Sequence, residues 1–183
     1  MVFLGFAFPV PVYYIIGNLL LTYARRNHMF RKMRRFKQQL PEEECLDILE
    51  KAPRGVLAVL GDEGYPYTVP LNFVYHEGRL YFHTAFEGHK IDAIKNYDKA
   101  SFCVLYEGYQ NPGEWWYYFK SVIAFGKVRI MEDRDEINEK LRLLAMKYMP
   151  AEEIESDMAK NAHRAGMIEL SIEHVTGKRV EEK

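Results

Sequence analysis

Cysteine is scarce in this chain of 183 residues, where only Cys45 and Cys103 occur, in quite different segments. Two such cysteines make no disulfide framework and lack the spacing of a zinc site, which fits a reducing compartment. Cys103 lies inside the run SFCVLY, which is typical of a core strand, so we expect no catalytic role for it. A chain of this length can bury a single-domain core without disulfides or a structural metal.

Metal-ligand and nucleotide-binding motifs are also absent. The six histidines are scattered and form no HExxH or similar pattern, so we expect no metal. No GxGxxG follows a predicted strand, and a Rossmann-type donor domain is therefore not predicted. The sequence contains no internal repeat and no low-complexity tract. A functional site has to be sought within one compact domain.

Charge is missing from Val2 to Ala24, and acidic residues are missing from Arg25 to Lys37, which contains seven basic residues. A secretory signal peptide carries its positive charge before the apolar run, not after it. One interpretation is a membrane anchor, because 23 uncharged residues are just long enough to span a bilayer and the positive-inside rule would keep the domain on the inner face. Prolines and polar residues weaken such a span: Pro9, Pro11, Gly17 and Asn18.

The other interpretation is that the natural chain starts at Met29 or Met33. We favour it because every recognisable element lies beyond Met33. We therefore divide the chain into a leader over residues 1–33 and a domain over residues 34–183, and expect the domain to be cytoplasmic. Without residues 1–37 the formal charge falls from −1 to −8, which argues against nucleic acid as a partner.

Hydrophobic periodicity and turn residues predict a mainly β domain with a few helices. A helix is expected over Glu42–Lys51, opened by Pro41 at its first position and by three glutamates that suit the positive end of the helix dipole. Strands are expected over residues 55–60, 100–106, 117–131 and 168–174, and helices over 134–149 and from Glu152 onward. The segment 108–116, with adjacent tryptophans, is predicted to be a long hairpin loop that serves an interface or ligand lid, or packs on the barrel end.

The segment with the most candidate binding residues contains two strand-like runs, YPYTVPLNFVY and LYFHTAF, joined by a turn at His76-Glu77-Gly78. Pro70 has no N–H for a sheet ladder, so the first run is expected at a sheet edge or bulge, with backbone groups beside Pro70 free for a ligand. In the second run, alternation places Leu80 and Phe82 on one face and His83 on the other.

The sequence EGHK follows these strands and leads into a short helix-like run, IDAIKNY. Gly88 allows close approach of a ligand to the backbone, and the unpaired N–H groups of a helix start, beside His89 and Lys90, suit a phosphomonoester. An alternative stays open on this pattern, in which Lys90 is a solvated helix residue and His83 an ordinary strand histidine.

Four segments resemble, in the same order, the Nim-type flavoproteins named for 5-nitroimidazole resistance, within the pyridoxamine 5'-phosphate oxidase-like FMN-binding split barrels. They are YPYTVPLNFVY, LYFHTAFEGHKIDAIKNY, FKSVIAFGKVRIM and MIELSIEHVTGKRVEE. The resemblance covers about residues 34 to 183. It implies a six-stranded antiparallel split β-barrel with flanking helices, a homodimer, and FMN in a cleft at the subunit interface.

The resemblance also implies roles for particular residues. Four residues would line the flavin ring and polyol, mostly through their backbone: Val69, Pro70, Leu71 and Asn72. Four more would take the ribityl chain and phosphate: Thr84, Gly88, His89 and Lys90. His83 would be the catalytic, substrate-side residue near the flavin ring, and Ser121 would lie in the same cleft.

Two departures from the family bear on function. The chain ends at His174 to Lys183 without the arginine-bearing segment that grips the substrate phosphate in the oxidases, so vitamin B6 oxidation is not expected. The phosphate pair is His-Lys where the oxidases have Arg-Lys, which would make phosphate binding weaker or pH-dependent. The predicted function is an FMN-dependent reductase of nitroaromatic or quinone-like acceptors, with NAD(P)H as a possible donor. The alternative is a non-catalytic flavin- or haem-binding protein of the same fold.

Overall fold

The computed structural model describes residues 30–181. Lys37–Lys183 forms one compact unit. The apolar segment Val2–Ala24 and the alternative start at Met29 lie outside the described residues. Among the described residues, no helix is both long and apolar enough to cross a bilayer.

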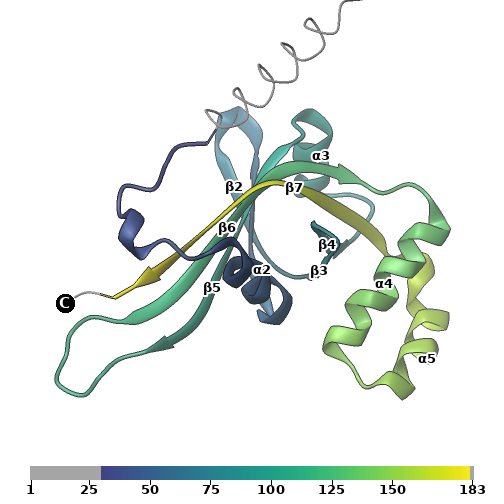
Figure 1. Cartoon of the computed structure of the whole chain (residues 1–183). Coiled ribbons are helices and arrows are strands. Elements are labelled where there is room, and N and C mark those ends of the chain that lie inside the picture. The colour runs from purple at the N-terminus through teal and green to yellow at the C-terminus, as the bar shows by residue number, and fades with distance from the viewer. Residues whose placement is uncertain (1–29, 182–183) are drawn as a thin grey trace, which may run out of the picture. The chain divides into compact units, whose positions relative to one another are not determined.

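One antiparallel sheet of seven strands forms the body of the domain (Figure 1). The strands are β1 (Arg54–Leu60), β2 (Pro66–Asn72), β3 (Val74–His76), β4 (Arg79–Thr84), β5 (Lys99–Tyr109), β6 (Tyr118–Ile130) and β7 (Gly166–Val180). Their order is β2-β1-β5-β6-β7-β4-β3, so β2 and β3 form the two edges of the sheet. Pro70 lies in an edge strand, opposite Val56 of β1, as its missing N–H predicts.

The strand count corrects the expected six-stranded barrel, and Phe73 explains the difference. The predicted run YPYTVPLNFVY is interrupted at Phe73, so that β2 pairs with β1 whereas β3 pairs with β4. The Phe73 side chain is fully buried. Its N–H and carbonyl bond to the Tyr148 hydroxyl, at 3.0 and 2.9 Å, instead of a neighbouring strand. One continuous run therefore supplies both edges of a curled half-barrel.

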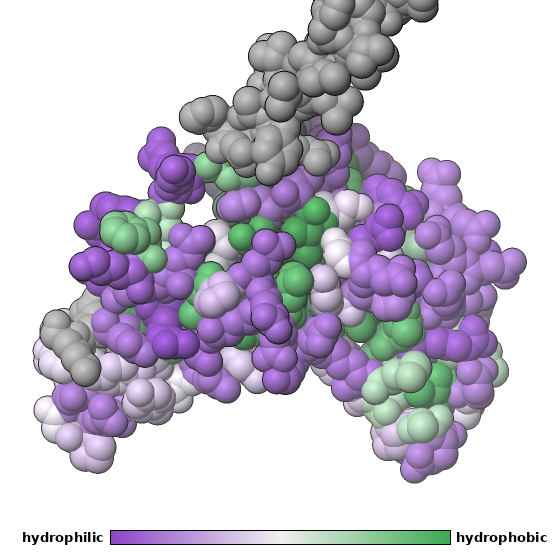
Figure 2. All heavy atoms as spheres, viewed as in Figure 1, coloured by the Kyte–Doolittle hydropathy of each residue, from purple (hydrophilic) through white to green (hydrophobic). Residues whose placement is uncertain are grey.

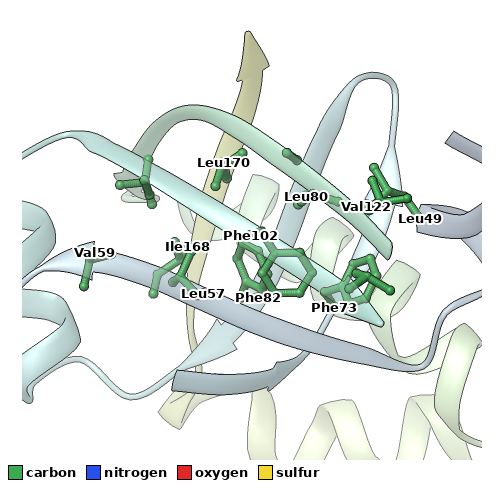
Figure 3. Packing of buried hydrophobic residues seen from close by; sticks show 14 of the residues in the cluster. Leu49, Leu57, Val59, Phe73, Leu80, Phe82, Phe102, Val122, Ile168 and Leu170 are labelled. Carbon is green, nitrogen blue, oxygen red and sulfur yellow. The ribbon is translucent and has the colours of Figure 1, made fainter. Parts of the chain in front are cut away.

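The main core fills the concave side of this curl (Figure 3). Phe102 of β5 lies between two other buried rings, with centroid distances of 4.7 Å to Phe73 and 4.9 Å to Phe82. Leu57 and Ile168 pack in the same cluster from β1 and β7. The predicted alternation along β4 is confirmed, because Leu80 and Phe82 are buried in this core whereas His83 is exposed.

Within residues 30–181, four α-helices flank the sheet: α2 (Glu42–Lys51), α3 (His89–Asn96), α4 (Arg134–Tyr148) and α5 (Ala151–Asn161). Short 3-10 turns occur at Phe36–Gln38, Asp62–Gly64 and Ala162–Arg164. The predicted helix Glu42–Lys51 is confirmed, but Pro41 is its N-cap and not its first helical residue. The strands expected over 100–106 and 168–174 are longer than predicted, because β5 and β7 continue to Tyr109 and Val180. Only residues 110–117 remain as the hairpin loop.

The α4–α5 pair covers a second, smaller core next to β4 and β7 (Figure 1). Tyr81 and Met167 of the sheet pack there against Ile137, Leu141 and Met158. Hydrophobic residues also reach the surface of this helix pair (Figure 2). They form an area separate from the hydrophobic residues at the centre of the view. The predicted stripe of Met and Leu on these helices is therefore partly core, and partly available to line a cavity.

A buried carboxylate ties this helix pair to the sheet. Glu169 of β7 is 5% exposed and accepts two hydrogen bonds from the Arg129 guanidinium of β6, at 3.1 and 2.8 Å. Arg129 also reaches Glu136 on α4, at 3.5 Å. Burial raises the pKa of Glu169, but the bonds and charge of Arg129 outweigh it, so the pKa lies below its ordinary value.

Candidate functional site

A cavity of about 690 Å³ lies between the sheet and the α4–α5 pair. Its sheet wall is formed by Pro70, Leu71 and Asn72 of β2 together with His83 of β4. Its helix wall is formed by residues of α4, α5 and the following turn: Leu141, Leu144, Ala145, Tyr148, Met149, Asp157, Met158, Asn161, Ala162, Arg164 and Ala165. A volume of this size is typical of sites for drug-sized or cofactor-sized ligands. The structure thus brings four of the predicted site residues into one cavity.

Tyr148 fixes the position of the helix wall against β2. Its hydroxyl oxygen accepts from the Phe73 N–H, and its single O–H proton is shared between the carbonyls of Phe73 and Pro53. Three backbone groups that no strand pairs are therefore met by one side chain at the end of α4. Since Phe73 directly follows Asn72, this arrangement holds the strand end that lines the cavity.

His83 stands on the exposed face of β4, where the cavity meets α5. Loss of water around its imidazole lowers the pKa, and the charge of Lys90 lowers it further. Asp157 of α5 acts in the opposite direction and raises the pKa of His83, although the net pKa stays below the ordinary value. The imidazole is consequently neutral near pH 7, with one N–H to donate.

The loop from β4 to α3 follows His83 directly and contains the residues that the resemblance assigns to a phosphate site, called the anion seat below. Thr84 is 2% exposed, and its hydroxyl has no hydrogen-bond partner within residues 30–181. Gly88 is the N-cap of α3 with φ of 122°, and a Cβ there would meet no atom within 4 Å. The first intrahelical bonds run from the N–H groups of Ile91 and Asp92 to the carbonyl of Gly88. The N–H groups before them, at the start of α3, precede the intrahelical hydrogen bonds, and Lys90 adds a positive charge to this helix end.

The His89 side chain contacts Tyr67 and Asp62. Its ring stacks on Tyr67 of β2, with centroids 4.0 Å apart, and its Nε2 lies 3.5 Å from Asp62 Oδ2. The imidazole is thus engaged by the start of β2, whereas the charge of Lys90 acts on His83. In this arrangement Lys90 and the backbone, not the His89 ring, make up the cationic part of the anion seat.

Val69 and Ser121 do not line the cavity. Val69 pairs with Leu57, whose side chain is in the core, so only its backbone is available to a ligand. Ser121 of β6 lies between Leu105 of β5 and Lys178 of β7. His83 pairs with Met167, near the other end of β7, so the structure does not bring Ser121 to the cavity of the same chain.

The sequence prediction missed the polar residues that α5 and the next turn contribute: Asp157, Asn161 and Arg164. They recur at spacings of four and three residues, which places them on one face of a helix. That spacing was readable in the sequence, but it lies about 75 residues from the strand motif and nothing local links the two. Among residues 30–181, no group of three His, Cys, Asp or Glu side chains could hold a metal ion.

The family model described as pyridoxamine 5'-phosphate oxidase matches residues 41–179. The chain belongs to this family. The match spans every strand of the sheet except the last residue of β7, and it includes the cavity and the anion seat. No curated protein matches the sequence.

Solved structures share the split-barrel fold. A candidate 5-nitroimidazole antibiotic resistance protein from Bacteroides thetaiotaomicron is 21% identical, with a TM-score of 0.65 over 79% of this chain and 90% of that one. A flavocytochrome from Azotobacter vinelandii is 20% identical, with a TM-score of 0.68 over 86% and 78%. A FAD- and haem-binding protein from Mycobacterium smegmatis is 19% identical, with a TM-score of 0.66 over 79% and 74%. At these identities the likeness shows the fold.

Proposed function

We propose that this protein binds FMN and reduces nitroaromatic or quinone-like acceptors. The observation that carries the proposal is the junction of two sites: a cavity lined by Pro70–Asn72 and His83, and an anion seat at Thr84 and Gly88–Lys90. A flat ring system with a terminal phosphate matches this pair of sites. Membership of a family described as an oxidase, and neighbours named as a flavocytochrome and a FAD-binding protein, support the binding of a flavin.

The residues of the anion seat fit a phosphomonoester. The buried Thr84 hydroxyl lacks a partner among the described residues, and a phosphate oxygen or ribityl hydroxyl would provide one. The space next to Gly88 admits the group, and the start of α3 with Lys90 supplies positive charge. We favour FMN over FAD because this seat terminates a ligand.

The sheet wall would orient the ring. Pro70 and Leu71 present an apolar surface, and Asn72 adds an amide at the cavity. When bound, the flavin supplies the electron-transfer chemistry, and the protein supplies orientation, exclusion of water and hydrogen bonds. His83 can donate its N–H to a nitro or quinone oxygen as negative charge develops there.

The proposal includes a homodimer, with the cofactor cleft completed by a second copy. The outward face of the sheet carries apolar residues that the core does not use: Val56, Cys103 and Ile123 share one row of paired residues, and Leu105 is 70% exposed. Exposed apolar surface of this kind is typical of an interface. Ser121 pairs with Leu105 and lies on the same face, so a dimer built there would turn Ser121 toward the other subunit.

A second function has support from two neighbours, whose names include a flavocytochrome and a haem-binding protein. In that case the protein would bind flavin or haem without turnover, and His83 would be a contact or an axial ligand. The visible spectrum of the purified protein separates flavin from haem, and chromatography of the released cofactor separates FMN from FAD.

Substitution of His83 tests the catalytic part of the proposal. We expect His83→Ala to keep FMN but to reduce an acceptor about 100-fold to 10,000-fold more slowly, the usual range for general acid assistance. Rapid-mixing absorbance follows reduction by the donor and reoxidation by a nitroaromatic or quinone separately, and only reoxidation should slow. His76→Ala is the matched control, since His76 lies outside the cavity, on the other strand of the same hairpin. Unchanged reoxidation in His83→Ala would leave His83 as a strand residue and remove it from the mechanism.

A further inference from the structure

The helix wall of the cavity carries its own polar row, separate from the residues that suit the cofactor. Asn161 Nδ2 donates to Asp157 Oδ1 at 2.6 Å, and Arg164 Nη2 donates to Asn161 Oδ1 at 2.6 Å. All three residues line the cavity opposite the sheet wall. A carboxylate and a guanidinium are thus held on one wall by an amide between them.

The turn that carries Arg164 is held in place from α4. The Arg134 guanidinium donates to the carbonyls of Ala162 and Ala165, at 2.9 and 3.0 Å, and to the Asn138 side chain. These carbonyls flank Arg164 in the chain, so its backbone is fixed at both sides. The backbone that carries the exposed Arg164 side chain is therefore held in place, and hydrogen bonds link the side chains of the row to one another.

Arg164 retains donors for a ligand. A guanidinium has five N–H groups, and within residues 30–181 only Asn161 accepts from this one. No acidic side chain of the described chain forms an ion pair with it, in contrast to Arg142, whose guanidinium contacts Glu155 at 2.8 Å. Planar guanidinium groups with free N–H pairs bind carboxylates in a bidentate way.

The row has a direction relative to His83. Asp157 of α5 lines the cavity together with His83, and its charge raises the pKa of that imidazole. Arg164 lies beyond the end of α5, in the turn Ala162–Arg164, and precedes Met167, the strand partner of His83, by three residues, a span of at most about 10 Å. An anionic group would be repelled by Asp157 and attracted by Arg164, so a ligand with one anionic end would bind in a single orientation.

We propose that the acceptor is a single-ring aromatic compound with an anionic substituent, bound between the sheet and α5 with that substituent on Arg164 and its reducible group at His83. This inference rests on the proposed function for the identity of the reducible group. The site on Arg164 does not depend on turnover, because it is a binding contact of this chain.

The test compares two acceptors of the same size, 4-nitrobenzoate and 4-nitrobenzyl alcohol, on full-length protein loaded with FMN and reduced beforehand with dithionite. The ratio of their reoxidation rate constants should favour the anion in the parent protein, and should fall about tenfold or more in Arg164→Gln. Lys160→Gln, an exposed lysine of α5 that does not line the cavity, removes the same charge and should keep the parent ratio. An unchanged ratio in Arg164→Gln would overturn the inference.

A second measurement separates this inference from the proposed function. Equilibrium dialysis measures the affinity of the oxidised protein for 4-nitrobenzoate without any turnover. If no acceptor is reduced, the reductase proposal fails, but a loss of affinity of about tenfold in Arg164→Gln, and not in Lys160→Gln, still supports the Arg164 site. Equal affinity of the three proteins would reject it.

Discussion

Lys90 and Lys147 lie in environments that differ in how well they accommodate a positive charge. Lys90 is half-buried at the start of α3, beside backbone N–H groups and an unpartnered Thr84 hydroxyl. Lys147, near the end of α4, has its Nζ buried with no hydrogen-bond partner in the described part of the chain. A bound phosphate would neutralise the charge of Lys90. No acidic side chain among residues 30–181 forms an ion pair with Lys147. Their substitutions should have different consequences.

Lys90→Ala should weaken FMN binding by about 1.5 to 3 kcal/mol, the usual contribution of a charge-assisted hydrogen bond. The physical reason is the loss of a charged side chain at the start of α3, where the His89 ring is already stacked on Tyr67. Flavin titration of the apoprotein measures the change. Lys95→Ala, an exposed lysine at the other end of α3, is the control. Equal affinity of parent and Lys90→Ala would remove Lys90 from the site.

Lys147→Met should stabilise the fold near pH 7. Burial lowers the pKa of Lys147 from 10.5 to about 8, and its ammonium is met only by the ring faces of Phe73, at 4.2 Å, and Tyr148, at 5.8 Å. The pKa is lower in the folded state, so the destabilisation is complete below pH 8 and disappears as the pH rises to 10.5. We expect a gain of about 1 to 2 kcal/mol at pH 7, after allowing for solvent around the side chain.

Urea unfolding at several pH values checks this prediction. The parent should become more stable between pH 8 and 10.5, relative to Lys147→Met, and the two should converge above that range. Lys160→Met makes the same change on an exposed site of α5 and should leave the stability nearly unchanged. A Lys147→Met protein that is less stable than the parent at pH 7 would show that the contact with Phe73 outweighs burial.

Individual residues show which parts of the candidate site could be predicted from the sequence. The strand motif with Pro70 and the alternation at His83 predicted residues that do meet in one cavity, because both depend on local rules of strand structure. Arg164 was missed because its role depends on how α5 docks on the sheet, which no local pattern records. The ring position of His89 depends on a contact with Tyr67, 22 residues earlier, and was equally beyond a local reading.

At the scale of elements, helix and strand positions followed from periodicity to within a few residues, as α2 and α4 show. The division of one predicted strand into β2 and β3 did not. Phe73 continues the apolar pattern of its strand, and only the Tyr148 hydroxyl, from a helix 75 residues away, takes up its backbone groups. Because the interruption between β2 and β3 depends on a hydroxyl from a distant helix, it cannot be predicted from the sequence of the strand alone.

The link between α4 and the sheet should weaken in acid. Because the pKa of Glu169 is lower in the folded state, its pairing with Arg129 stabilises the fold above the ordinary carboxyl range and is lost as the pH falls through the folded pKa. Glu169→Gln leaves the Arg129 guanidinium without its buried partner, and should cost about 1 to 3 kcal/mol at pH 7. Urea unfolding at pH 7 and pH 3 measures the difference.

The cost of Glu169→Gln should shrink as the pH falls through the lowered pKa of Glu169, because the parent carboxyl then becomes protonated as well. Glu155→Gln serves as the control, because the Glu155 side chain is exposed and pairs with Arg142 on the helix surface. A cost that is the same at both pH values would assign the effect to packing around Glu169 instead of its charge.

At the scale of the whole molecule, the concave side of the sheet is filled and the outward face is not. Leu57, Phe102 and Ala124 are fully buried, whereas their neighbours on the opposite face, Val56 and Cys103, are exposed or half-buried. Alternation along a strand predicts which residues share a face, but it does not say what covers that face. A second copy of the chain, placed there, would account for both the apolar row and the position of Ser121.

Leu105→Arg should therefore disrupt a homodimer. Leu105 is 70% exposed on β5 and pairs with Ser121, so a charged side chain there would be buried between the two copies without a partner. Light scattering should give twice the chain mass for the parent and a single chain mass for Leu105→Arg, which should also release its flavin. Met146→Arg, at a site on α4 that is 67% exposed, should remain dimeric and keep its flavin. A parent protein that is monomeric and yet holds flavin tightly would refute the dimer, since its cofactor site would then be complete within one chain.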